Sequence, residues 1–117
     1  MKTDLKKLTD EVGKLMIAMA GQNEDDVRLS AEIIDTYGMV LREKRPFGDP
    51  VARSAKEVSL ASMMAAEAMS IRRRCAEGSP EREAWSRLLG VVEEVLELHL
   101  AVLLAAEVRE TDGKAVA

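Results

Sequence analysis

Residues 50–80 read PVARSAKEVSLASMMAAEAMSIRRRCAEGSP. Because the stretch opens with a proline directly after Asp49 and its first strong stop is Gly78, it predicts one long helix over residues 50–76. The Ser-Pro pair that follows the glycine caps and opens the next helix at once. A connection this short places the two helices antiparallel. The stretch therefore predicts a long helical hairpin, which decides the fold.

The same start and stop signals divide the remainder of the chain. They predict further helices over residues 4–19, 24–45 and 80–109, and a frayed tail over 110–117. The predicted N-caps of the first three helices are Thr3, Asn23 and Asp49. Apolar residues recur at steps of three and four in each helical segment, and no segment alternates apolar and polar residues as a strand does. We therefore predict an all-α fold, a bundle of about four helices in a single domain over residues 1–117.

Composition restricts the classes of function. The net charge is -4 and the one dense basic run is Arg72–Arg74, so we expect no nucleic-acid partner. No apolar run reaches the roughly 18 residues of a membrane span, so we expect no membrane association. The single cysteine, Cys75, allows no intrachain disulfide. These features predict a cytoplasmic protein.

A stripe of mostly small residues runs along the helix predicted over 50–76. A helix that is apolar on more than one side must be buried on more than one side, so one face is expected to contact a partner chain. The alternative is a central helix inside a monomeric bundle, with the methionines filling gaps in the core. The stripe consists of Ala52, Ala55, Ser59, Ser62, Ala66 and Met69, and a second apolar set consists of Leu60, Met63, Met64 and Ile71.

The helix predicted over 80–109 is apolar nearly all round in its C-terminal half. Its residues Leu98, Leu100 and Leu104 lie off the main apolar stripe, which again indicates burial by more than one neighbour. Both helices therefore predict an interface with a second copy of the chain or with another protein. The predicted interface consists of Ala55, Ser59, Leu60, Ser62, Met63, Met64, Ala66, Met69, Leu98, Leu100 and Leu104.

Glu93, Glu94 and Glu97 form a Glu-Glu-x-x-Glu motif. Carboxylates at positions i and i+4 share a helix face and can bind a hard cation. The motif resembles that of the all-α nucleotide pyrophosphatases, whose carboxylates hold magnesium against a pyrophosphate. That family has a second acidic cluster, Glu-x-x-Asp, on a following helix, whereas the nearest approximation here, Glu107 to Glu110, lies on the same predicted helix. The alternative interpretation is a solvated acidic face.

Three further features have ordinary structural interpretations. His99 lies on the apolar stripe of its helix and is expected to be a core histidine that makes one hydrogen bond. A di-iron site needs Glu-x-x-His pairs, and the residue three positions before His99 is Leu96. Arg72–Arg74 suit the negative end of a helix dipole, or they bind a phosphate or an acidic partner. Cys75 has no histidine nearby in sequence to activate it. We expect no catalytic residues, no metal site and no cofactor.

These observations favour a non-enzymatic protein–protein interaction module that forms a homodimer or a higher oligomer. One concrete form is a small regulator that binds and blocks another protein, such as a transcription factor antagonist of the anti-activator type. The alternative is a metal-dependent nucleotide pyrophosphohydrolase that uses Glu93, Glu94 and Glu97. A DNA-binding role is disfavoured by the acidic balance and by the absence of a basic recognition helix.

Overall fold

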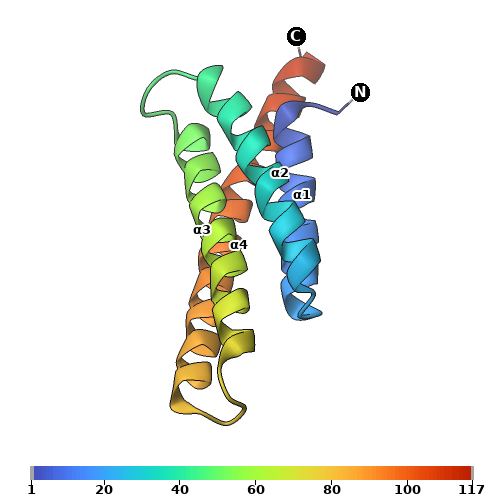
Figure 1. The fold of residues 1–117 in the computed structure, drawn as a ribbon. Coiled ribbons are helices and arrows are strands. Elements are labelled where there is room, and N and C mark those ends of the chain that lie inside the picture. Colours follow the sequence, from blue (N-terminus) through green and yellow to red (C-terminus); the bar gives the residue numbers. More distant parts are fainter. Residues whose placement is uncertain (1, 117) are drawn as a thin grey trace.

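The computed structural model describes residues 2–116 of the chain. Within that range the chain forms four helices and no strand (Figure 1). The prediction of an all-α bundle is thus confirmed, including the long hairpin formed by the last two helices. The helices are α1 (Asp4–Ala20), α2 (Glu24–Glu43), α3 (Pro50–Arg74) and α4 (Pro80–Val116).

The predicted caps start the helices. The side chains of Thr3, Asn23 and Asp49 each accept a hydrogen bond from a backbone N–H in the first turn of α1, α2 and α3, which satisfies one of the donors left unpaired at a helix start. The ends of α2 and α3 each come two residues before the predicted position. In α2 the reason is local, because residues directly before Pro46 avoid helical geometry.

The last helix is longer than predicted. It continues to Val116, past Arg109, so the prediction of a frayed tail was wrong for residues 110–116, whereas Ala117 lies outside the described residues. The segment contains no proline, and its one glycine costs a helix only about 1 kcal/mol relative to alanine. The side chain of Glu110 also forms an ion pair with Arg45 at the end of α2, which ties this turn to the bundle.

The helices pack as two antiparallel hairpins. Helix α3 lies between α2 and α4, whereas α1 packs mainly on α2 and less extensively on α4. The turn between α3 and α4 extends beyond the turn between α1 and α2 (Figure 1). The molecule is therefore elongated, with extents of 57 × 27 × 20 Å. Its radius of gyration is 15.5 Å, compared with about 13 Å for a compact domain of this length.

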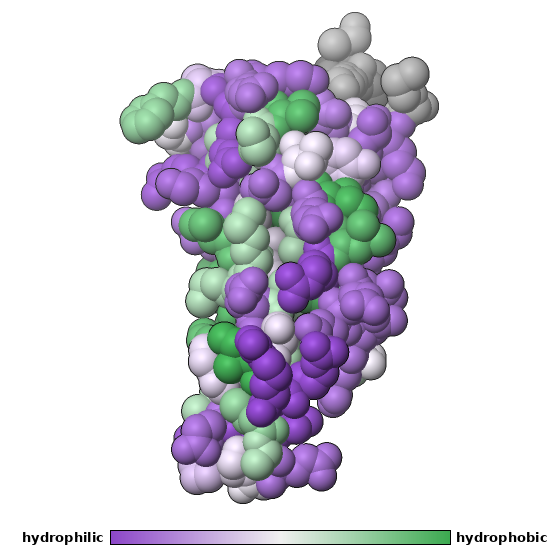
Figure 2. Space-filling model, viewed as in Figure 1, coloured by the Kyte–Doolittle hydropathy of each residue, from purple (hydrophilic) through white to green (hydrophobic). Residues whose placement is uncertain are grey.

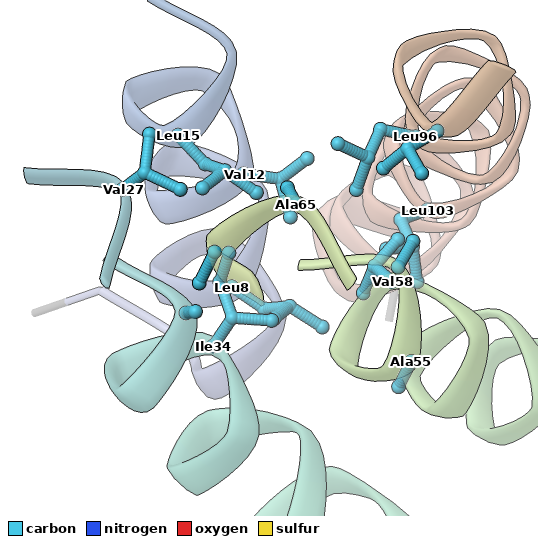
Figure 3. Packing of buried hydrophobic residues seen from close by; sticks show 14 of the residues in the cluster. Leu8, Val12, Leu15, Val27, Ile34, Ala55, Val58, Ala65, Leu96 and Leu103 are labelled. Atoms are coloured by element: carbon cyan, nitrogen blue, oxygen red, sulfur yellow. The ribbon is translucent and has the colours of Figure 1, made fainter. Parts of the chain in front are cut away.

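The core combines large side chains from α1, α2 and α4 with small ones from α3 (Figure 3). Burial of the large aliphatic side chains supplies most of the driving force for folding, at roughly 1.5–3 kcal/mol for each. The fully buried large residues are Leu5, Leu8, Val12, Leu15, Val27, Ile34, Val58, Leu96 and Leu103.

In the described part of the chain, no helix is long and apolar enough to cross a membrane.

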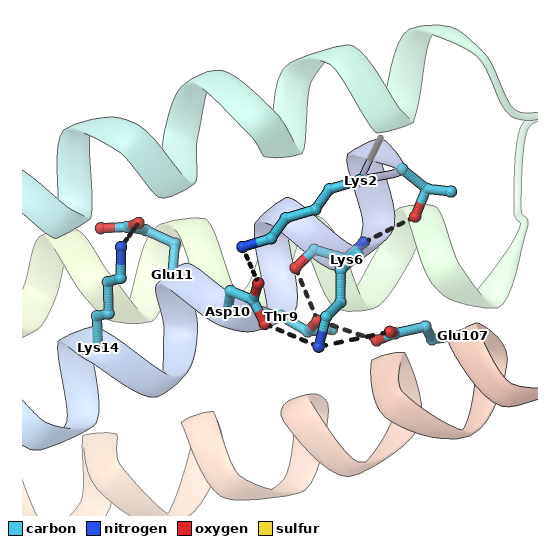
Figure 4. A network of polar contacts seen from close by, with 8 residues as sticks. Lys2, Lys6, Thr9, Asp10, Glu11, Lys14 and Glu107 are labelled. Atoms are coloured by element: carbon cyan, nitrogen blue, oxygen red, sulfur yellow. Dashed lines mark hydrogen bonds and ion pairs between the residues drawn. The ribbon is translucent and has the colours of Figure 1, made fainter.

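A polar network joins α1 to the distal part of α4 (Figure 4). The hydroxyl of Thr9 donates to a carboxylate oxygen of Glu107 at 3.0 Å. Lys6 lies 3.9 Å from the same carboxylate and 3.0 Å from Asp10, which also pairs with Lys2 at 2.9 Å. The hydrogen bonds from Lys2 and Lys6 lower the pKa of Asp10 from its ordinary value. The network therefore links α4 to α1 through polar contacts.

Acidification should weaken the packing of α1. The ion pair with Lys44 lowers the pKa of Asp4, just as Lys2 and Lys6 lower that of Asp10. A carboxylate whose folded-state pKa is lowered stabilises the fold above its unfolded pKa, near 4, and loses that contribution as the pH falls through the folded-state pKa. We expect the free energy of unfolding to fall below about pH 4. Urea unfolding across a pH series should show a smaller acid loss in the double variant Asp4→Asn, Asp10→Asn, and an equal loss in both proteins would contradict this.

Gly38 marks a close approach of α2 and α3. A methyl group at this buried position would lie 3.4 Å from the carbonyl oxygen of Ala55, a backbone atom that cannot move aside cheaply. Gly13 in α1 is the opposite case, because nothing lies within 4 Å of the position that its methyl group would occupy. Substitutions at the two glycines therefore allow the intrinsic helix preference of alanine to be measured separately from the cost of crowding between α2 and α3.

We expect Gly13→Ala to raise the free energy of unfolding by about 0.5–1 kcal/mol, because alanine loses less conformational entropy in a helix. Gly38→Ala should gain less than Gly13→Ala, and Gly38→Leu should lose about 1–3 kcal/mol because the side chain has no space. Urea unfolding followed by far-ultraviolet circular dichroism measures all three. A neutral Gly38→Leu would mean that α2 and α3 are not in close contact at Gly38.

Candidate interaction surface

The predicted interface divides into a buried part and an exposed part. The small-residue stripe of α3 is buried inside the chain, with exposed fractions of 7% or less for all its members from Ala55 onward. The hydroxyl of Ser59 donates to Asp35 of α2 at 2.7 Å, so this part of the stripe faces α2. We therefore correct the predicted interface, because residues covered by their own bundle are not available to a partner. The residues removed from the predicted interface are Ala55, Ser59, Ser62, Ala66 and Met69.

The second apolar set of α3 faces solvent. Leu60, Met63 and Met64 have exposed fractions of 47%, 41% and 48%, and Ile71 is half-buried. Leu60, Met63 and Met64 therefore remain in the candidate surface. Figure 2 shows apolar side chains recurring along this side of the molecule among hydrophilic ones.

Helix α4 carries a longer apolar surface. Leu98 and Leu104 are exposed, whereas Leu100 is half-buried and packs against the core. From Leu98 to Ala106 the sequence contains no Asp, Glu, Lys or Arg. A helix face that water covers normally carries charged residues, so an uncharged exposed face in this segment indicates a missing neighbour.

Exposed positions of α4 recur at steps of three and four along its solvent side. We call them the outer stripe of α4, and Glu94 is its one charged member. Of these residues the predicted interface included Leu98 alone, although their spacing in the sequence is that of a coiled-coil seam. The outer stripe consists of Val91, Glu94, Leu98, Ala101, Ala105 and Val108.

The acidic motif overlaps the outer stripe of α4 at Glu94. Glu93, Glu94 and Glu97 are all exposed. Among the residues that the structure describes, no three histidine, cysteine or acidic side chains form a group that could hold a metal ion. The resemblance to the nucleotide pyrophosphatases therefore stays at the level of the five-residue motif.

The remaining candidates have identifiable contacts. The Nδ1 atom of His99 lies 3.0 Å from the hydroxyl of Ser54, which joins α4 to α3 as expected of a histidine at the core. Arg73 pairs with Glu24 at 3.2 Å, so one member of the basic run holds α3 against the start of α2. The half-buried thiol of Cys75 lies at the end of α3, 3.4 Å from a backbone carbonyl oxygen.

Comparison of the chain with protein-family models, with curated proteins and with solved structures finds no match. The function must therefore be argued from these surfaces.

A leucine at Ser62 should disrupt the bundle itself. Ser62 is fully buried, and its hydroxyl donates to the backbone carbonyl of Ser59 at 2.8 Å. We expect Ser62→Leu to lower the free energy of unfolding by about 1–3 kcal/mol, since overpacking forces the helices apart. The melting temperature should fall at every protein concentration. Met64→Leu, an exposed change on the same helix, is the control and should be nearly neutral. A neutral Ser62→Leu would contradict the burial of the stripe.

Proposed function

We propose that the chain is a non-enzymatic protein-binding module that associates with a second copy of itself through the outer stripe of α4. The observation that carries the proposal is the exposed, uncharged run of Leu98, Ala101, Leu104 and Ala105. Removing such a surface from water stabilises a complex by roughly 25 cal/mol for each Å² of apolar area. Isolated exposed leucines need no explanation, but a contiguous apolar helix face does.

The spacing of the outer stripe suits an antiparallel pairing of two copies. Residues of the stripe are spaced alternately three and four positions apart. When two such helices pair in an antiparallel orientation, a residue that precedes a step of three lies opposite a residue that precedes a step of four. With a twofold axis between residues 99 and 100, Leu98 faces the partner's Ala101 and Val91 faces the partner's Val108. A large side chain then meets a small one at the centre of the seam, Glu94 faces the partner's Ala105 on either side of it, and two medium side chains meet near each end. The stripe is therefore complementary to itself, as a twofold interface requires.

A twofold seam on α4 alone spans about 26 Å of helix, at about 1.5 Å per residue from Val91 to Val108. A stable interface usually needs about 800 Å² from each partner. The half-buried residues Val95 and Val102 flank the stripe on one side and Leu104 on the other, which widens the apolar surface. This width supports a dimer through α4 more strongly than through the shorter exposed set on α3.

The second part of the proposal is that the assembled module acts on another protein. Leu60, Met63 and Met64 form an exposed apolar patch on α3 outside the outer stripe. Methionine side chains are flexible and polarizable and recur on adaptable binding surfaces. We propose that the chain is a small cytoplasmic regulator that blocks or modulates its target, with a transcription factor as one class of target.

Self-association gives the test. At micromolar concentration, light scattering should give at least twice the 12.8 kDa mass of one chain. Leu98→Glu places a charge at the centre of the outer stripe and should produce a monomer that keeps its helical circular dichroism.

Ile17→Glu is the matched control, because Ile17 is an even more exposed apolar residue, at 76%, but lies on α1. This variant should remain associated. A monomeric wild-type chain, or a Leu98→Glu variant that stays associated, would overturn the assignment of the interface.

A further inference from the structure

A cavity of about 500 Å³ opens where the end of α2, the connection to α3 and the first turns of α3 meet. Its volume lies within the range of ordinary ligand-binding pockets. The residues that carry its chemistry are Arg42, Arg45, Phe47, Arg53 and Lys56. We call this site the basic pocket. Hydrophilic side chains gather around the connection between α2 and α3 (Figure 2).

The basic pocket is lined by four cations and by no carboxylate. Arg45 is neutralised by Asp49 at 3.5 Å and by Glu110. Among the residues that the structure describes, no ion pair within 4.0 Å involves Arg42, Arg53 or Lys56. Like charges held together without compensation repel one another, and an anion bound between them relieves that repulsion. In a chain of net charge -4, such a cluster indicates a site for an anionic ligand.

The pocket also presents an aromatic side chain. Phe47 is fully exposed, at 108% of its reference area. Gly48 has φ of +84°, a left-handed conformation that glycine adopts without strain, and it turns the chain directly after Phe47 into the cap of α3. A phenyl ring held in water beside cations suits a ligand that combines negative charge with an apolar group. Phenylalanine and arginine are both enriched at protein–protein interfaces.

We propose that the basic pocket binds an acidic segment of a protein partner, with carboxylates on the arginines and an apolar side chain against Phe47. This inference rests on the proposed function, because it names the chemistry of the protein that the module recognises. A single-stranded nucleic acid is the less favoured ligand, since successive bases need several stacking side chains and Phe47 is the one aromatic residue lining the pocket. The acidic surface elsewhere also repels a long polyanion, whereas a short segment occupies the pocket alone.

The test uses the full chain and a fluorescein-labelled peptide of alternating glutamate and leucine residues. Fluorescence anisotropy should show saturable binding that weakens as salt is raised. The same peptide with glutamine in place of glutamate should bind at least about tenfold more weakly, and so should the peptide with serine in place of leucine.

The decisive comparison is between two double variants of α3 that remove the same charge. Arg53→Gln, Lys56→Gln should weaken peptide binding about tenfold or more. Arg73→Gln, Arg74→Gln, at the other end of the same helix, should leave it unchanged. Phe47→Ala should weaken binding of the leucine peptide, with no change for the serine peptide.

Several outcomes would overturn the proposal. One is equal affinity in the two double variants, and another is no saturable peptide binding at all. Tighter binding of an oligothymidylate than of the peptide would assign the pocket to nucleic acid, and full displacement of the peptide by millimolar inorganic phosphate would reduce it to a small-anion site. Light scattering on the same samples reports self-association independently, so loss of the peptide site and loss of the dimer are distinguishable.

Discussion

The bundle depends on the small side chains on the inward-facing positions of α3. This helix packs against α2 on one side and α4 on the other, and both can approach because its inward positions are mostly alanine and serine. Gly38 of α2 meets the backbone at Ala55, where even one methyl group would be in contact. The large aliphatic residues of the core come mainly from the other three helices. Close packing leaves little spare volume along α3: Val58 and Met69 are buried, whereas Leu60, Met63 and Met64 are exposed to solvent.

Helix lengths determine which surface of the hairpin stays uncovered. Helix α4 has 37 residues whereas α1, its second neighbour, has 17. At about 1.5 Å per residue, α1 can run beside less than half of α4. The core side of α4 is filled by α3 and, over part of its length, by α1. The outer stripe lies on the opposite side and has no neighbour within the chain. Its apolar character is therefore unexplained by the packing of a single copy, which is the physical basis of the proposed dimer.

The sequence predicted the fold well because its signals were local. A helix cap or a turn depends on a few adjacent residues, and the structure confirms the caps at Thr3, Asn23 and Asp49 and the turn at Gly78.

The candidate surface depended on information that a sequence pattern lacks. Periodicity shows which residues share a helix face, but it does not show which neighbour covers that face. The small-residue stripe of α3 was thus included in the interface although α2 covers part of it. The basic pocket was missed because its cations come from three segments: Arg42 lies in α2, Arg45 lies in the connection that follows, and Arg53 and Lys56 lie in α3.

The two proposed surfaces use different residues and different forces, and their consequences combine. The outer stripe is apolar except for Glu94, so association through it should depend less on salt than binding to the basic pocket, which acts through charge and should weaken as salt is added. No residue of the pocket belongs to the stripe, so association through α4 uses none of the side chains that hold the anion.

A twofold dimer presents two basic pockets. A target that carries two acidic segments, or that is itself a dimer, would then be held at both, and the second contact would form at the effective concentration set by the first. Weak individual pockets would then be sufficient for the proposed regulator, and its action on the target would depend on its own concentration, because the dimer forms only at a sufficient concentration of the chain.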